Sequence, residues 1–242
     1  MKDFISNLNK KMIEDFASVN PIKNPVAQKI SLLSFKEFLY IFEQYSLFSK
    51  NITNFLLKGF YSVSYYGWAE LSLELIQNIR EELNVDDSCF ETHRVPHYLL
   101  LRQGFADANI DIGNVKASLS TKNFMSSTLE IMENTNPNIV AGGVYALESS
   151  AVPELNMVYT WVEKAFDLAQ QKVPKKISTF FKSHVEEIEV GHEARLQEVC
   201  RLYIRDSKQI QNFEIGFCSI ISIMDRWWQE LMTEALLSEH VS

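Results

Sequence analysis

Apolar residues recur at helical spacing along almost the whole chain. Between residues 3 and 18 the apolar side chains fall on one side of a helix; they are Phe4, Ile5, Leu8, Met12, Ile13 and Phe16. Only eight glycines and six prolines interrupt the 242 residues, and no stretch shows several short alternating strands separated by turns. The pattern predicts an all-α protein.

Further helices are expected wherever this spacing continues beside a start or stop signal. Ser34 and Glu37 have the spacing of a capping box, Pro96 suits the first turn of a helix, and Pro153 separates two helical stretches. No internal repeat, low-complexity tract or linker composition is visible, so residues 1–242 are expected to form one domain. The predicted helices cover residues 34–48, 51–65, 67–84, 96–106, 120–133, 138–151, 153–170, 175–204 and 207–237.

Composition adds limits on function rather than on fold. Apolar residues make up 46% of the chain and charged residues 22%, which is ordinary for a folded protein with a full core. The net charge of −8 argues against a nucleic-acid partner or an anionic membrane surface. The late apolar run at residues 215–224 is about half the length that crosses a bilayer.

The cysteines and the first residues bear on the compartment. Cys89, Cys200 and Cys218 are far apart and form no Cys-x-x-Cys pair, which argues against a disulfide scaffold or a thiolate zinc site. The first 16 residues contain no uninterrupted apolar stretch of the kind found in signal peptides. We therefore expect a soluble, cytoplasmic protein.

Several ionisable residues stand among apolar neighbours, where catalytic and metal-binding side chains of helical proteins are found. Glu148 follows an apolar, glycine-containing run in residues 142–155. Glu82 lies beside the apolar face of the helix at 67–84, whereas Glu81 is expected about 100° away, toward solvent. His97 begins the helix at 96–106.

The stretch "FFKSHVEEIEVGHEARLQEV" (180–199) holds two of the five histidines. His184 and His192 lie about 80° apart around a helix, and Glu189 forms Glu-x-x-His with His192, a spacing that presents both groups to one point. Phe180 and Phe181 come one turn before His184, so this face is not plainly exposed to water.

Each residue also has an ordinary structural interpretation. Glu82 suits the surface of an amphipathic helix, Glu148 suits one half of a buried ion pair, and His97 suits a helix cap. The 184–192 segment, taken alone, reads equally well as a solvated charged face. Taken together, imidazoles and carboxylates without thiolates suit iron or manganese better than a structural zinc ion.

In their order along the chain these motifs resemble the heme-oxygenase-like diiron proteins. They are the glutamate of "NIREELN", the histidine of "VPHYLLL", the glutamate of "YALESS" and the final His/acid/His helix. The likeness is greatest to the group typified by the chlamydial protein associating with death domains (CADD-like proteins). It is weaker to the pyrroloquinoline quinone synthesis protein C and the TenA-type thiaminases.

The resemblance covers roughly residues 20–235 and implies a heme-oxygenase-like bundle of about seven to nine helices. It also implies two bound irons, with manganese as the alternative metal. The implied metal ligands are Glu82, His97, Glu148, His184, Glu189 and His192.

One spacing departs from the family pattern, which is His-x-x-x-Asp-x-x-His. This chain has one more residue between His184 and Glu189. A π-bulge would restore the direction of His184; otherwise His184 points away and only one iron is held.

Other departures bear on the reaction. Ala27 stands where CADD-like proteins carry a reactive tyrosine, and no matching lysine follows near Tyr159, so synthesis of para-aminobenzoate is not expected. Tyr40, Tyr145 and Trp161 could line a cavity or simply fill the core.

The resemblance implies an O₂-dependent non-heme diiron oxidase or oxygenase that acts on a small, partly apolar organic substrate. The irregular last motif motivates the alternative, a degenerate, non-catalytic bundle that binds a partner. A homodimer is the default expectation for oligomeric state.

Overall fold

The computed structural model describes residues 4–85, 95–185 and 189–238, apart from the side chains of residues 189–191. These residues form ten helices and no strand, which confirms the all-α prediction and exceeds the expected seven to nine helices. The helices are α1 (Phe4–Asp15), α2 (Pro25–Gln28), α3 (Phe35–Tyr65), α4 (Ala69–Glu82), α5 (His97–Asp107), α6 (Leu119–Met132), α7 (Pro137–Leu168), α8 (Lys175–Ser183), α9 (Glu189–Tyr203) and α10 (Ser207–Ser238).

Two predicted helix boundaries are wrong. The stretches 34–48 and 51–65 form the single helix α3, which opens with the expected capping box of Ser34 and Glu37. Asn51 does not interrupt it, because its side-chain amide donates to the carbonyl of Leu47, one turn earlier. The stretches 138–151 and 153–170 likewise form the single helix α7, which continues through Pro153.

One predicted helix is divided into two in the structure. The stretch 175–204 contains two helices, α8 and α9, with residues 186–188 outside the described part of the chain. The one-turn helix α2 was not predicted; Asn24 caps it and Pro25 occupies its first turn.

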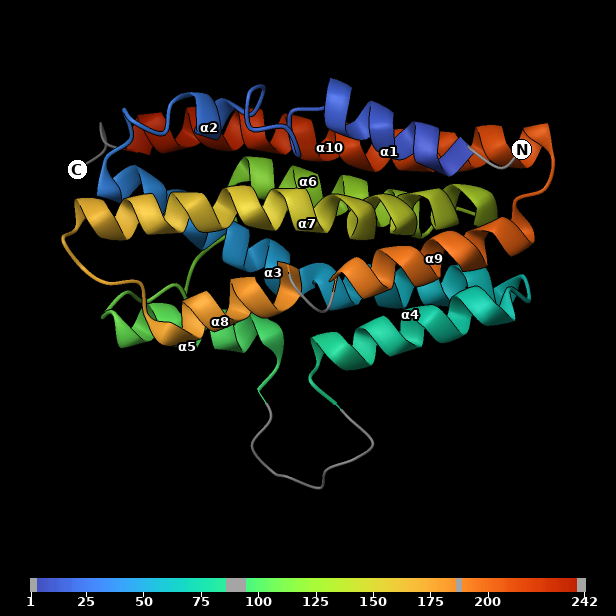
Figure 1. Ribbon diagram of the computed structural model, residues 1–242, viewed down its shortest axis with the longest axis horizontal. Coiled ribbons are helices and arrows are strands. Elements are labelled where there is room, and N and C mark those ends of the chain that lie inside the picture. Colours follow the sequence, from blue (N-terminus) through green and yellow to red (C-terminus); the bar gives the residue numbers. More distant parts are fainter. Residues whose placement is uncertain (1–3, 86–94, 186–188, 239–242) are drawn as a thin grey trace.

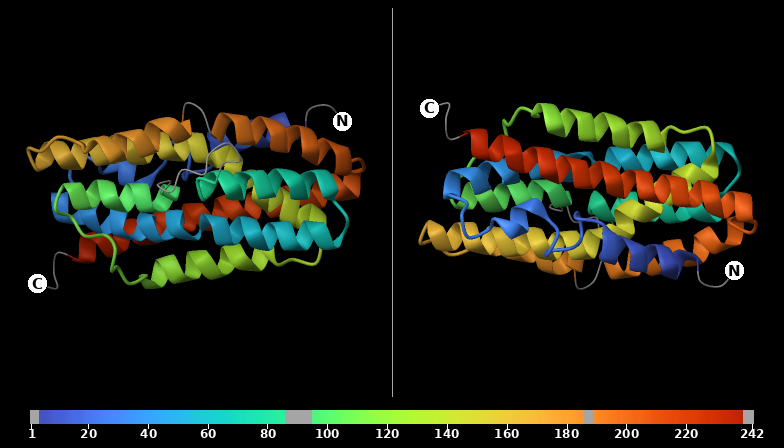
Figure 2. Two further views of the ribbon diagram at one scale, coloured as in Figure 1. Left: turned by 90° about the horizontal axis from the view of Figure 1, so that it is seen from below. Right: turned by 90° about the horizontal axis from the view of Figure 1, so that it is seen from above.

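The longest helices, α3, α7 and α10, pack against one another, and α6 packs against all three (Figures 1 and 2). Glycines allow α7 and α10 to approach closely. A Cβ atom added at Gly142 would lie 2.0 Å from the carbonyl oxygen of Phe213, and one added at Gly216 would lie 1.9 Å from that of Ile139. The glycines near Glu148 therefore serve close helix packing.

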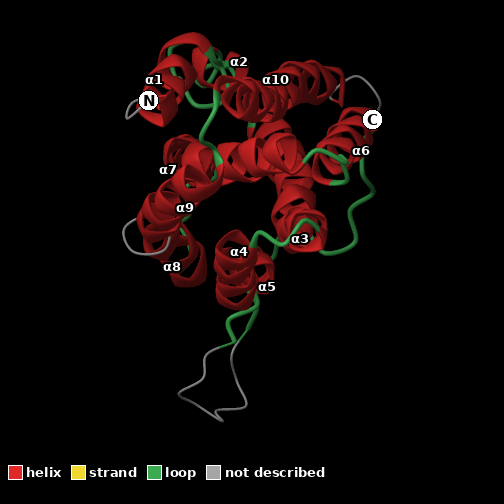
Figure 3. Ribbon diagram, turned by 90° about the vertical axis from the view of Figure 1, so that its right-hand side faces the viewer, coloured by secondary structure: helices red, strands yellow, loops and turns green. Residues whose placement is uncertain are grey.

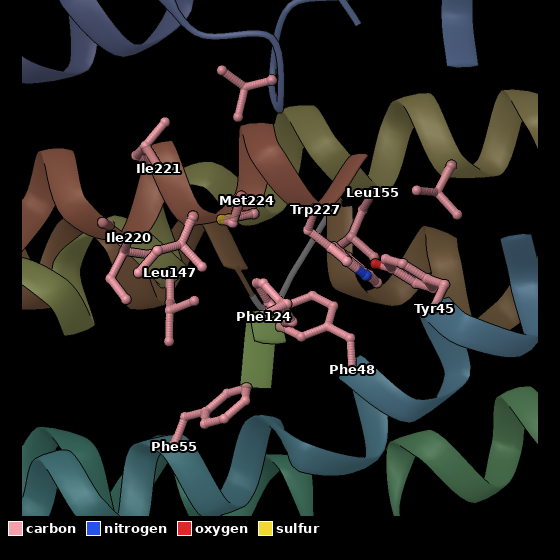
Figure 4. Packing of buried hydrophobic residues seen from close by; sticks show 14 of the residues in the cluster. Tyr45, Phe48, Phe55, Phe124, Leu147, Leu155, Ile220, Ile221, Met224 and Trp227 are labelled. Carbon is pink, nitrogen blue, oxygen red and sulfur yellow. The ribbon is translucent and has the colours of Figure 1, made fainter. Parts of the chain in front are cut away.

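Aromatic side chains fill the space between α3, α6 and α10. The rings of Phe48 and Phe124 meet edge to face with centroids 5.3 Å apart, and Phe124 stacks on Trp227 at 4.5 Å (Figure 4). Tyr145 and Trp161 are buried in the same core cluster. Dense aromatic packing of this kind excludes water from the centre of the bundle.

The other side of the bundle consists of shorter helices that follow one another in two lines, α4 with α5 and α8 with α9 (Figures 1 and 3). Helix α8 packs against α5, α9 packs against α4, and both α8 and α9 contact α7. The C-terminal ends of α4 and α8 and the N-terminal ends of α5 and α9 thus come together beside the middle of α7.

The cysteines and the apolar helices were also considered in the sequence. Cys200 and Cys218 are free thiols, while Cys89 lies outside the described residues. Among the described helices, none combines the length and the apolar character that a membrane span needs.

Candidate metal centre

Three side chains converge where the helix ends meet: Glu82 at the end of α4, His97 at the start of α5 and His184 at the end of α8. We call them the first group. One ligand atom from each lies within 4.8 Å of the other two. Glu82 Oε2 is 3.5 Å from His97 Nδ1, and Glu82 Oε1 is 3.9 Å from His184 Nε2.

The start of the 184–192 motif has a local irregularity, and residues 186–188 lie outside the described part of the chain. His184 and Val185 form a π-helical turn at the end of α8, and His184 points toward Glu82. The direction of His184 is the one expected from a π-bulge, while its role as a ligand stays a prediction. The turn also fits the tendency of π-turns to occur at functional sites.

A backbone hydrogen bond sets the orientation of the His184 ring. Nδ1 of His184 lies 2.6 Å from the carbonyl oxygen of Phe180, and only a protonated Nδ1 can donate to a carbonyl. In the neutral ring, Nε2 then carries the lone pair that faces Glu82. Metal-binding histidines usually hold their second nitrogen in this way.

The charges within the first group favour a metal-binding state. Burial alone would raise the pKa of Glu82, but contact with His97 and the charge of His184 outweigh it, so the pKa is lowered. Burial lowers the pKa of His184, against the opposite effect of Glu82. An ionised carboxylate beside a neutral imidazole is the form in which both residues bind metals.

A second group adjoins the first and consists of Glu81, Glu148 and His192. His192 on α9 lies 3.2 Å through Nδ1 from Glu148 Oε2 on α7, and through Nε2 it contacts Glu81 on α4. The single imidazole thus joins two carboxylates from opposite sides. His192 also helps to lower the pKa of Glu82, so the two groups influence each other electrostatically.

The expectation that Glu81 faces solvent holds only in part. Its side chain is 31% exposed, and it is held by Gln77, which donates at 2.6 Å, and by Arg195 at 3.8 Å. Burial would raise the pKa of Glu81, but Gln77, His192 and Arg195 together lower it. The missed signal was the polar stripe of Glu74, Gln77 and Glu81, which repeats at helical spacing beside the apolar face.

Five of the six predicted ligands lie in these two groups, and that they bind a metal stays a prediction. Three belong to the first group and two to the second: Glu82, His97 and His184, then Glu148 and His192. The side chain of Glu189 lies outside the described part of the chain, so its role as a ligand stays a prediction.

A cavity of about 60 Å³ opens beside both groups. Glu82, Glu148 and His184 are among the residues that line it. Its other walls are mostly apolar and aromatic: Tyr45, Phe48, Ser49, Ile52, Leu147, Ala151, Glu154, Leu155 and Phe180. None of Tyr40, Tyr145 and Trp161 lines it; Tyr40 instead donates to Glu234 at 3.1 Å, outside the cavity.

The first group fits a metal by its donor chemistry. Two imidazole nitrogens and one carboxylate oxygen form the set that non-heme Fe(II) oxygenases use. His97 Nδ1 is buried and makes no hydrogen bond within the described residues, so an electron-pair acceptor would supply its missing partner. The second group fits less directly, because both nitrogens of His192 already face carboxylates.

The sequence matches the model of DUF3865, a domain of unknown function with a solved structure, over residues 2–234. A comparison with curated proteins finds no match. A crystal structure of a CADD-like protein of unknown function from Nostoc punctiforme is similar, with 30% identity and a TM-score of 0.87 over 97% of each chain.

Two more distant structures share the fold. A domain of unknown function with a heme oxygenase-like fold from Shewanella denitrificans has a TM-score of 0.74 and 12% identity, covering 98% of this chain and 96% of the other. A TenA homolog from Pseudomonas syringae pv. tomato has a TM-score of 0.70 and 11% identity, covering 96% and 92%. These likenesses confirm the resemblance noted in the motifs and the heme-oxygenase-like fold.

Proposed function

The chain belongs to the DUF3865 family, and on that premise we propose that it is an O₂-dependent non-heme diiron oxidase or oxygenase. Its substrate would be a small, partly apolar organic molecule. The observation that carries the proposal is the convergence of Glu82, His97 and His184 within 4.8 Å beside an apolar cavity.

The chain's own residues prepare this site in three ways. Phe180 fixes the His184 tautomer through its carbonyl and covers the ring, with centroids 4.4 Å apart. Glu82 stays ionised because the neighbouring histidines lower its pKa. The apolar cavity walls exclude bulk water from the space next to these ligands. Bound iron would supply the redox chemistry that dioxygen activation requires.

The two groups are expected to differ in affinity. The first group presents its ligand atoms together, whereas a second iron would need His192 to release Glu81 or Glu148. We therefore expect the first group to fill at lower iron concentration, with Mn²⁺ as the competing metal.

Anaerobic titration with Fe²⁺, followed by metal analysis of the desalted protein, tests the proposal. We expect about two irons per wild-type chain, and we expect Glu148→Ala to lose at least the second. Glu163→Ala, an exposed carboxylate on the same helix α7, is the control and should keep the wild-type iron content.

Catalytic competence needs a second readout. Iron-loaded protein should consume O₂ faster than Glu148→Ala when candidate small substrates are added. If folded wild-type protein remains free of iron under reducing, iron-replete conditions, the oxidase proposal fails and the non-catalytic binding bundle becomes the better account.

A further inference from the structure

Glu154 is a buried acid that lies outside the two groups. It sits on α7, six residues after Glu148, and is only 2% exposed. Its Oε1 accepts a hydrogen bond of 2.9 Å from the indole nitrogen of Trp228 on α10, and this is its only hydrogen bond within the described part of the chain. Burial raises the pKa of Glu154 to about 8, although the bond from Trp228 acts in the opposite direction.

The Glu154 carboxyl lines the same cavity as Glu82 and Glu148. Among the described residues that form the cavity wall, none is a lysine or an arginine. Three acids therefore line a space whose remaining described walls are mainly apolar, and His184 is the one basic residue in that described lining. His97 and His192 contact Glu82 and Glu148 without lining the cavity. Since Glu82 and Glu148 belong to the metal groups, Glu154 is the acid left without a basic partner.

The charge of this cavity discriminates between classes of small molecule. A carboxylate ligand would be repelled by the ionised Glu82, and an uncharged ligand would meet Glu154 as a neutral acid and gain only an ordinary hydrogen bond from it. An ammonium group would donate a charge-assisted hydrogen bond to Glu154 and let it ionise. The aliphatic part of the same molecule would contact apolar walls such as Phe48 and Leu155.

We propose that Glu154 is the anchor of a subsite that binds the amino group of a small primary amine, with its carbon chain in the apolar cavity. A cavity of about 60 Å³ holds roughly four to six water-sized groups, which limits an occupant that causes no rearrangement to a few heavy atoms. The amine's role as a substrate rests on the proposed function, but its binding can be measured separately.

The indole N–H of Trp228 provides a direct readout, because it bonds to Glu154. In protein labelled with ¹⁵N-tryptophan this resonance can be assigned by the Trp228→Phe variant. We would titrate the protein with n-butylamine, n-butanol and butyrate, in the anaerobic iron-loaded and the iron-free forms. We expect n-butylamine to shift the Trp228 signal and to bind at least tenfold more tightly than the other two probes.

Two variants test the subsite itself. Glu154→Gln keeps an acceptor for Trp228 but removes the charge, so its affinity for n-butylamine should fall at least tenfold, to the level of n-butanol. Ala151→Leu should fill the cavity and block the probe while leaving Glu154 in place. Glu163→Gln, exposed on the same helix, should bind like wild type.

Equal affinity of wild type and Glu154→Gln for n-butylamine would overturn the subsite. So would the absence of n-butylamine binding to wild type when the n-butylamine concentration is 50 times the dissociation constant of n-butanol. Should Glu154→Gln fail to fold, binding by Ala151→Leu with wild-type affinity would overturn it instead. Iron content measured on the same samples separates the two proposals, because Glu154 is not among the residues expected to bind iron. A chain that binds the amine but no iron contradicts only the oxidase.

Discussion

The two sides of the bundle differ in the length of their helices and in the side chains that they bring together. The α3, α7 and α10 side consists of helices of 31 or 32 residues that pack through apolar and aromatic side chains. The side formed by α4, α5, α8 and α9 consists of helices of 9 to 15 residues whose ends bring carboxylates and imidazoles together. Helix α7 belongs to both, with Gly142 facing α10 and Glu148 facing His192.

The difference shows how a helical protein can bury charge without losing its fold. Long, uninterrupted helices satisfy their backbone groups internally and supply apolar area, which stabilises the fold. The shorter helices supply helix ends, where side chains from four elements can meet within a few ångströms. Changes on the first side should therefore act mainly on stability, and changes on the second mainly on metal and ligand binding.

The largest effect is expected on the tightly packed side. Gly142→Ala would place a Cβ atom 2.0 Å from the backbone oxygen of Phe213, so α7 and α10 must move apart. We expect a loss of about 3 kcal/mol or more in the free energy of unfolding, measured by urea denaturation.

The neighbouring Gly143→Ala is the matched control. Its added Cβ atom would lie 2.8 Å from Cγ2 of Ile131 and 3.4 Å from Cγ1 of Ile220, which are side-chain rather than backbone atoms, so its cost should be smaller, about 1 to 2 kcal/mol. Equal losses from the two substitutions would contradict the role given to the α7–α10 backbone contact.

An effect of similar size, confined to high pH, is expected at the cavity. The pKa of Glu154 is raised in the folded protein to about 8 from an ordinary value of 4.5, so the folded state holds a proton that the unfolded state releases. The stability that this group contributes is complete below about pH 4.5 and is lost as pH rises toward 8.

Glu154→Gln removes this titration and should stabilise the protein relative to wild type at pH 8, by up to roughly 4 kcal/mol, and much less at pH 5. Urea denaturation at the two pH values measures the difference, with Glu163→Gln as the exposed control. If the difference in free energy of unfolding between the variant and wild type does not increase with pH, Glu154 is ionised in the folded protein.

The smallest effect is expected at the rim of the metal centre. Arg195 pairs with Glu74 at 2.5 Å and with Glu81 at 3.8 Å, but its side chain is largely exposed. Arg195→Gln should therefore change stability by less than about 1 kcal/mol. It should weaken binding of the second iron by about tenfold, because it leaves Glu81 less firmly placed.

Iron titration monitored by metal analysis checks this prediction, and Arg201→Gln, exposed on the same helix α9, serves as its control. An unchanged second iron affinity in Arg195→Gln would mean that Arg195 has no part in positioning Glu81.

The sequence pattern predicted the helices better than their boundaries. Pro153 suggested a break because proline removes a backbone hydrogen bond, at a cost of about 3 kcal/mol in a helix. Helix α7 nevertheless continues, with Leu155, Val158 and Trp161 buried just beyond it. Local propensity cannot reveal this, since the compensating contacts come from distant parts of the chain.

In the candidate site, too, some residues could be selected from the local sequence and others depend on contacts with distant parts of the chain. Glu82, His97 and His184 could be selected because ionisable residues among apolar neighbours are unusual, and their order resembled a known family. Glu81 was assigned to solvent from its own helix alone, whereas its contact with His192 comes from 111 residues away. Glu154 was not selected from the sequence, because its burial depends on Trp228 and on the cavity.

The central claim is that Glu82, His97 and His184 bind iron at the junction of the interrupted helices. Anomalous diffraction at the iron absorption edge, from crystals loaded with Fe²⁺ under anaerobic conditions, tests it most directly. The account predicts a strong anomalous peak between these three side chains. A peak found elsewhere, or none in folded protein loaded with iron, would contradict it.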